Sequence, residues 1–154
     1  MSDPEYIIYV VNEVPYDVDE EAIRIAAWCA LEAAESGWPV EMTVNLTTSE
    51  HVHELNYEYA GVDGPTDVLT FPSDPDAAEP DAPPYLGDVL IAVPVAEEQA
   101  ADGDNALILE LQKLAIHGTL HLMGFDHETP EGKSEMWAYE SVAMDRVRSL
   151  YGSA

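Results

Sequence analysis

The feature of this sequence that most limits its fold is the apolar stretch from Ala106 to Met123. It is too long for one strand, and its apolar residues fall on nearly every side of a helix. A helix that is hydrophobic all round is normally buried. Gly124 follows at a position typical of helix ends, because glycine adopts the left-handed backbone without strain. We therefore predict a central, buried helix formed around Leu107, Ile108, Leu109, Leu111, Leu114, Ile116, Leu120 and Leu122.

One polar stripe interrupts this helix, formed by Glu110, Lys113, His117 and His121 at spacings of three, four and four. The two histidines therefore lie one turn apart on one face, at an edge suited to the wall of a cleft. His127 follows the turn at Gly124, so the chain can return a third imidazole to the pair. Three imidazoles with one open position are typical of a catalytic zinc site. The sequence thus predicts one Zn²⁺ held by His117, His121, His127 and a water, although nickel or cobalt suits this donor set nearly as well.

The same histidine spacing occurs in a metalloprotease class whose first histidine is followed by a glutamate, the general base. Here that position is Gly118, which has no side chain. The ligand spacing is kept while the protease base is missing. Zinc lowers the pKa of its bound water toward about 7, so such a site needs no strong protein base.

Four further residues are candidates for orienting a metal ligand, binding substrate or transferring a proton. Asp126 precedes His127 and either orients this ligand from behind or serves as a turn residue. Thr66 either bonds substrate or caps a turn. Asp67 and Asp88 lie at predicted strand edges and are weaker candidates for proton transfer.

The composition is strongly acidic, with 31 acidic and 5 basic residues among 154 and a formal net charge of -26. Such a surface repels polyanions and opposes its own compact state. At 1 M salt the Debye length is about 3 Å, which screens both effects. We therefore expect a host with a salt-rich cytoplasm.

The length favours one domain spanning residues 1–154. The lone Cys29 indicates a packed thiol in a reducing compartment. The N-terminus lacks the basic start of a signal peptide, and no apolar run is long enough to cross a bilayer, so a cytoplasmic protein without membrane contact is expected.

The remaining patterns predict an α+β fold with a small mixed four-stranded sheet and about five helices. The recognisable elements follow the order β-α-β-α-β-β-α-α, and residues 73–85 read as a flexible, acidic, proline-rich loop. Strands are predicted over Tyr6–Val11, Val40–Leu46, Val68–Phe71 and Gly87–Val93, and helices over Asp17–Ser36, Thr47–Tyr59, Ala106–Met123 and from Thr129 to about Leu150.

Some side-chain positions follow from these patterns. In the first helix Ala22, Ile25, Trp28 and Cys29 are expected to face inward. In the last helix the expected inward positions are Met136, Tyr139, Ala143, Val147 and Leu150. His51 and His53 are two residues apart, so they point to different faces and are expected to be surface residues.

With these residues in view, the chain resembles the YbeY family of zinc-dependent endoribonucleases. The resemblance rests on Leu55-Asn56 to Tyr59, Asp63 to Pro72, Leu86-Gly87-Asp88, His117 to His127, and Glu135 to Ala138. It implies cleavage of single-stranded RNA in 16S ribosomal RNA 3′-end maturation and ribosome quality control. It also implies the small ribosomal subunit as a partner, no DNA, and His117, His121 and His127 as the metal ligands.

The chain departs from the family pattern at two positions. Ala60 stands where the family usually has an arginine, and Val62 where a basic residue is common. Alanine cannot replace the bidentate phosphate contact of a guanidinium. Two alternatives to the nuclease stay open. One is a ribosome-assembly protein with a mainly structural zinc, which Ala60 makes less remote, and the other is a metalloprotease-like hydrolase, which the histidine spacing favours and Gly118 disfavours.

Overall fold

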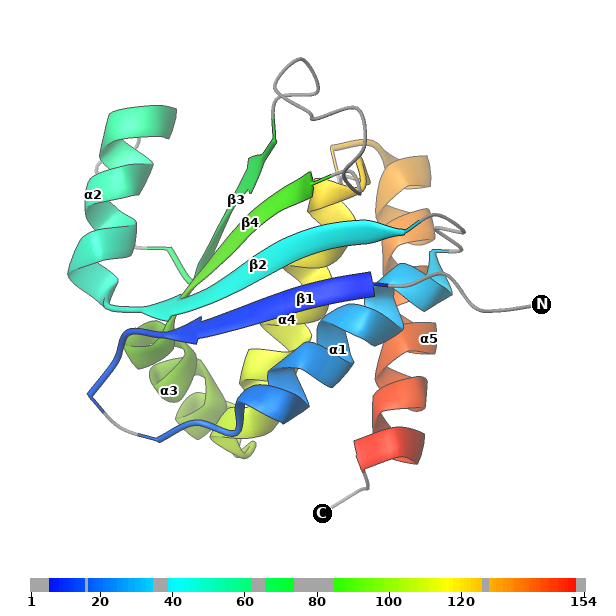
Figure 1. Cartoon of the computed structure of the whole chain (residues 1–154), viewed down its shortest axis with the longest axis horizontal. Coiled ribbons are helices and arrows are strands. Elements are labelled where there is room, and N and C mark those ends of the chain that lie inside the picture. Colours follow the sequence, from blue (N-terminus) through cyan, green and yellow to red (C-terminus); the bar gives the residue numbers. More distant parts are fainter. Residues whose placement is uncertain are drawn as a thin grey trace.

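The computed structural model describes residues 6–15, 17–34, 39–61, 66–73, 85–125 and 128–151. Within these ranges the chain forms an α+β fold with a mixed four-stranded sheet and five helices, as predicted (Figure 1). The strands are β1 (Tyr6–Asn12), β2 (Val40–Thr47), β3 (Val68–Pro72) and β4 (Tyr85–Ala92). The helices are α1 (Glu20–Ala33), α2 (Ser49–Ala60), α3 (Val93–Asp102), α4 (Leu107–Leu122) and α5 (Pro130–Tyr151).

The strand order in the sheet is β1-β2-β4-β3. β1 and β2 pair in parallel, and so do β2 and β4, because a helix (α1 or α2) lies in the chain between each pair of strands. β3 runs antiparallel to β4. The register places Val44 of β2 beside Val89 of β4, and Val68 of β3 beside Ile91. β4 therefore lies between two strands that both precede it in the sequence.

One face of the sheet forms the hydrophobic core with α1 and α4. The alternation in β2 is confirmed, because Val40, Met42, Val44 and Leu46 are all buried. α4 is buried over most of its circumference, as its composition predicted, and contacts β4, β3, α1 and α5. The left-handed backbone predicted after it is present at Gly124, with a φ of 100°. Figure 1 shows α4 behind the sheet, with α1 and α5 beside it.

The opposite face of the sheet is partly covered by α2. This helix contacts β4 and β3, and a hollow beneath it is lined by residues of both layers. Its N-cap is Thr48, whose hydroxyl accepts a hydrogen bond from the His51 backbone N–H at 3.2 Å. The predicted helix start at Thr47 was wrong, because Thr47 is still the last residue of β2 and α2 begins at Ser49.

α3 was not predicted as a helix. Val93 directly follows β4 and continues its apolar run, so the pattern indicated more strand. Pro94 at the start of the helix instead sets a helical φ, and Val93, Ala96 and Ala100 are buried at helical spacing. β4 also begins earlier than predicted, at Tyr85 and not at Gly87.

The inward face of α1 was predicted only in part. Ala22 and Cys29 are buried, whereas Ile25 and Trp28 are half-buried. α1 packs against β1, α4 and α5, so its buried surface is broader than a single stripe and is formed by Ala22, Ile23, Ala26, Ala27, Cys29, Ala30 and Leu31.

In α5 three of the five inward positions are confirmed as buried, namely Met136, Ala143 and Val147. Tyr139 is half-buried, and Leu150, near the end of the helix, is exposed. The predicted C-terminal part of the first helix (35–36) and most of the predicted loop (74–84) lie outside the described residues. Among the helices that are described, none is both long and apolar enough to span a membrane.

Candidate metal centre

The centre of the site is the pair His117 and His121, one turn apart on α4 as predicted. Their Nε2 atoms face each other at 3.0 Å, and their rings are nearly perpendicular with centroids 4.5 Å apart. Both side chains are half-buried. The rings are therefore held together at a partly exposed edge of an otherwise buried helix.

Glu140 of α5 fixes the orientation of the first ring. Its Oε1 lies 2.9 Å from Nδ1 of His117, and both side chains are about one-third exposed. A carboxylate on one ring nitrogen sets the ring orientation and leaves the other nitrogen as the ligand. Here that other nitrogen is the Nε2 that faces His121. Glu140 was not predicted from the sequence, since this contact depends on the packing of α5 against α4.

The histidine pair opens into a hollow with a volume of about 370 Å³. The opposite wall is the segment Thr66, Asp67, Val68, Leu69 and Thr70, which leads into β3. The structure therefore brings the predicted substrate residue Thr66 to the same hollow as both histidines.

The two weaker candidates, Asp67 and Asp88, lie in different places. Asp67 is in this hollow, where its Oδ2 accepts a hydrogen bond from Nε2 of Gln99 at 3.2 Å. Asp88 instead lines the hollow beneath α2, on the other face of the sheet. There its Oδ1 accepts a hydrogen bond from the Tyr85 hydroxyl at 2.6 Å. Burial, together with this bond, raises the pKa of Tyr85 to about 12.

The predicted third ligand His127 and its neighbour Asp126 lie outside the described residues. Within the part of the chain that is described, no group of three or more histidine, cysteine or acidic side chains is arranged to hold a metal ion. The separation of the His117 and His121 nitrogens can still be compared with that of two nitrogens bound to one zinc ion. Two nitrogens bound at about 2.0–2.1 Å to a tetrahedral zinc lie roughly 3.3 Å apart. The observed 3.0 Å between the Nε2 atoms is close to this separation, so the pair fits a metal.

Gly118 is a packing residue between α4 and the sheet. A Cβ at this position would lie 2.5 Å from Cγ1 and 3.1 Å from Cγ2 of Val89 on β4. A side chain at this position would require Val89 or the helix to shift. Packing against Val89 therefore disfavours a glutamate after His117.

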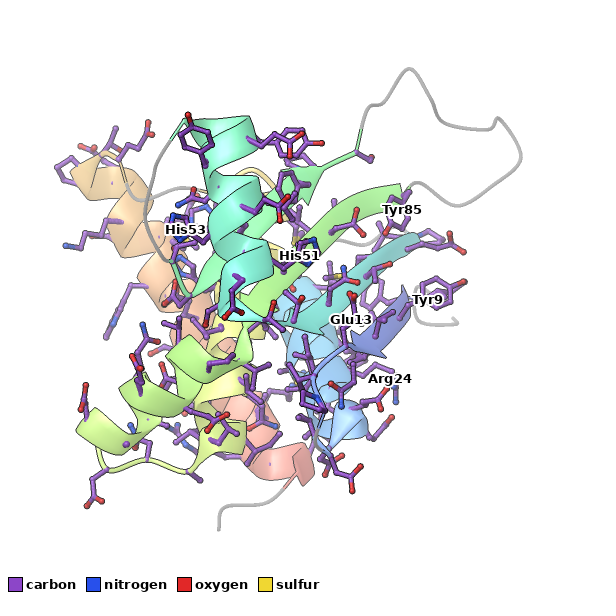
Figure 2. All side chains as sticks on the ribbon, turned by 90° about the vertical axis from the view of Figure 1, so that its left-hand side faces the viewer. Tyr9, Glu13, Arg24, His51, His53 and Tyr85 are labelled. Atoms are coloured by element: carbon purple, nitrogen blue, oxygen red, sulfur yellow. The ribbon has the colours of Figure 1, made fainter. Side chains whose placement is uncertain are left out.

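The two histidines of α2 are not part of this site. Figure 2 shows His51 and His53 on different sides of the helix, as predicted. Both are half-buried, and neither is fully exposed as a surface residue would be. Nδ1 of His51 lies 3.0 Å from the Thr47 hydroxyl, and the ring lines the hollow beneath α2.

Known proteins resemble this chain over most of its length. A family model described as endoribonuclease YbeY matches residues 11–148. A protein named endoribonuclease YbeY from Brevibacillus brevis is 37% identical over 153 residues, covering 91% of this chain and 96% of that protein. The protein of the same name from Roseiflexus sp. strain RS-1 is 40% identical over 147 residues, covering 91% and 92%.

A solved structure has a similar fold. The solution structure of TM1509 from Thermotoga maritima superposes with a TM-score of 0.59 at 27% identity, covering 93% of each chain. Two observations thus coincide: a family match over nearly all of the described elements, and a histidine pair on the central helix beside a hollow. This chain belongs to the YbeY endoribonuclease family.

Proposed function

We propose that the protein is a metal-dependent endoribonuclease that cleaves single-stranded RNA in the hollow between α4 and the segment leading into β3. The observation that carries the proposal is that His117 and His121 both line this hollow with their Nε2 atoms only 3.0 Å apart. Family membership supplies the substrate class, since the relatives are named endoribonucleases.

In this proposal His117, His121 and His127 would hold one Zn²⁺, which would leave one position for a water. When bound, zinc supplies Lewis acidity and lowers the pKa of its water toward about 7. Glu140 keeps the His117 ring turned toward His121, and Gly118 offers no competing base. Asp126, next to His127, is the proposed partner that orients this third ligand.

Thr66 is the proposed substrate contact. Its hydroxyl is a donor and an acceptor, so it can bond a phosphate oxygen or a ribose hydroxyl in the hollow that it shares with both histidines. Asp67 accepts a hydrogen bond from Gln99 and lines the same hollow, and it is the weaker candidate for proton transfer.

We further propose that the RNA is ribosomal, with maturation of the 16S 3′ end and ribosome quality control as the biological role. The small ribosomal subunit is then the partner, and the cytoplasm is the compartment. These points rest on the family resemblance alone.

The test combines metal analysis with RNA cleavage in salt that keeps the protein folded. We expect cleavage of a single-stranded RNA to stop after chelation and to return with added zinc. His121→Ala should lower the rate at least a hundredfold, whereas the matched control His53→Ala on α2 should not. Undiminished cleavage by fully metal-stripped protein would refute the proposal.

The protease-like alternative is disfavoured by packing. A glutamate at position 118 needs a Cβ about 2.5 Å from Cγ1 of Val89, so packing disfavours the base of that mechanism. Peptide cleavage by the zinc-loaded protein, lost in His121→Ala, would reinstate this alternative. The alternative of a ribosome-assembly protein with a structural zinc predicts tight subunit binding without any zinc-dependent cleavage.

A further inference from the structure

Two further hollows lie along the groove between α4 and α5, on the side of His117 that faces away from β3. The first, of about 190 Å³, is lined by His117, Lys133, Met136, Trp137 and Glu140. It adjoins a larger one of about 340 Å³, because Trp137 and Glu140 line both. Since His117 also lines the hollow beside β3, the three spaces follow one another across α4.

This groove gathers the basic side chains of a very acidic chain. The chain has only five lysines and arginines against 31 acids. Three of the five, Lys113, Lys133 and Arg148, line the two hollows, together with the carboxylate of Glu140. Of the other two, Arg24 lies in a separate hollow beside Trp28. Among the residues that line the two hollows, three cations therefore accompany one carboxylate, whereas the composition predicts an acidic surface, and we call this the cationic groove.

An aromatic ring lies at the centre of this cationic groove. Trp137 is 69% exposed, although tryptophan is among the residues that gain most from burial. It lines both hollows, so its ring borders the junction between them. Arg148 donates to the exposed Asp145 at 3.0 Å, and an exposed pair of this kind is weak enough to be replaced by a phosphate.

Cations beside an exposed aromatic ring are the features with which proteins hold single-stranded nucleic acid. The cations follow the backbone phosphates, and bases of any sequence stack on the ring. An acidic peptide lacks the flat bases that would use Trp137, and a basic peptide would meet three like charges. The volume of the larger hollow falls within the range of ordinary ligand pockets.

We propose that the α4–α5 groove binds the stretch of single-stranded RNA that flanks the cleavage site. One base stacks on Trp137, and Lys113, Lys133 and Arg148 contact the adjoining phosphates. The strand then passes His117 and enters the hollow beside β3. This inference rests on the proposed function for its substrate class, and it assigns the groove a role in binding and not in the chemistry.

The test measures binding separately from cleavage. Full-length protein is titrated into a fluorescent single-stranded RNA in EDTA, which stops the proposed nuclease, and anisotropy gives Kd over a salt series. Circular dichroism establishes that each variant is folded. We expect Trp137→Ala to weaken binding about tenfold, in line with loss of one stacked base, and Trp137→Phe to retain most of the affinity.

A charge substitution tests the phosphate contact. Each phosphate contact on a single strand contributes about 0.7 to the slope of log K against log salt. Lys113→Gln should therefore reduce this slope by about 0.7, while the matched control Arg24→Gln on α1 leaves the slope and Kd unchanged. Wild-type affinity in both Trp137→Ala and Lys113→Gln would overturn the proposal, as would absence of RNA binding by the wild type.

Two parallel measurements separate this proposal from the nuclease itself. If the variants cleave and bind like wild type, the groove assignment fails and the nuclease stands. If RNA binds through the groove but zinc restores no cleavage, the nuclease fails and the groove stands. A concentration-dependent dimer in sedimentation that Trp137→Ala abolishes would assign the groove to a second copy of the chain and overturn RNA binding there.

Discussion

The contact between Gly118 and Val89 gives the sharpest test of how α4 is placed. Gly118→Ala adds a Cβ at 2.5 Å from Cγ1 of Val89 in a fully buried interface. Overpacking of this kind costs about 1–3 kcal/mol. Replacing glycine by alanine inside a helix returns up to about 1 kcal/mol. We therefore expect a net loss of about 1–2 kcal/mol in the free energy of unfolding, measured by urea titration.

The companion variant Val89→Ala removes the two methyl groups that the new Cβ would meet. Alone it should cost about 2–3 kcal/mol, from roughly 0.8 kcal/mol for each buried methyl plus the cavity left behind. In the double variant the Cβ added at position 118 enters that space. The double variant should therefore be more stable than the sum of the single changes by about 1 kcal/mol or more.

A matched control separates this coupling from a general loss of stability. Val52 of α2 is also fully buried and does not lie against Gly118. Gly118→Ala combined with Val52→Ala should be additive. Additive behaviour of the Gly118 and Val89 pair as well would refute the packing argument, and with it the steric explanation for the missing base.

Three further outcomes can be checked directly. Glu140→Gln removes the charge beside His117 and should weaken metal binding about 10–100-fold, measured by competition with a chelator. The control Glu135→Gln on the same helix should leave metal affinity unchanged. Equal metal affinities of Glu140→Gln and wild type would contradict the orienting role of Glu140. Because the pKa of Tyr85 is raised to about 12, the stability that it contributes is present below about pH 10 and is lost between about pH 10 and 12. Wild type should therefore lose more stability over this range than Tyr85→Phe, and parallel losses would argue against the shift. Burial raises the pKa of the Cys29 thiol to about 11, so Ellman's reagent at about pH 8 should react with this thiol only when the protein unfolds. If the net charge of -26 makes folding depend on salt, the thiol should react rapidly in dilute buffer and slowly in concentrated salt.

Sequence patterns predicted the structure correctly where one physical requirement dominated a segment. α4 was predicted with its bounds nearly correct, because so apolar a helix has no stable position other than the core. β2 was predicted because its alternation matches one buried face. The histidine pair was predicted to share a face, because four residues make about one helical turn.

The sequence was insufficient where the outcome depends on what packs from elsewhere. Glu140 approaches His117 only because α5 lies along α4, and no spacing within α5 indicates that contact. Asp67 and Asp88 looked equivalent as polar residues at strand edges, yet they lie on opposite faces of the sheet, in different hollows. α3 was missed because apolar residues directly after a strand read as more strand, and only Pro94 marks the change.

The position of β4 between β2 and β3 has a consequence for how the protein is made. A growing chain cannot complete the sheet until residue 92 has left the ribosome, because the inner strand is synthesised last. α4 and Glu140 of α5 emerge later still, so the surface that receives the two rings exists before the rings do. Pairings between distant parts of a chain form slowly and leave strand edges exposed meanwhile. An unfinished copy of this protein would therefore hold a partly built sheet without its histidine helix, so the proposed cleavage would be confined to chains synthesised beyond α4.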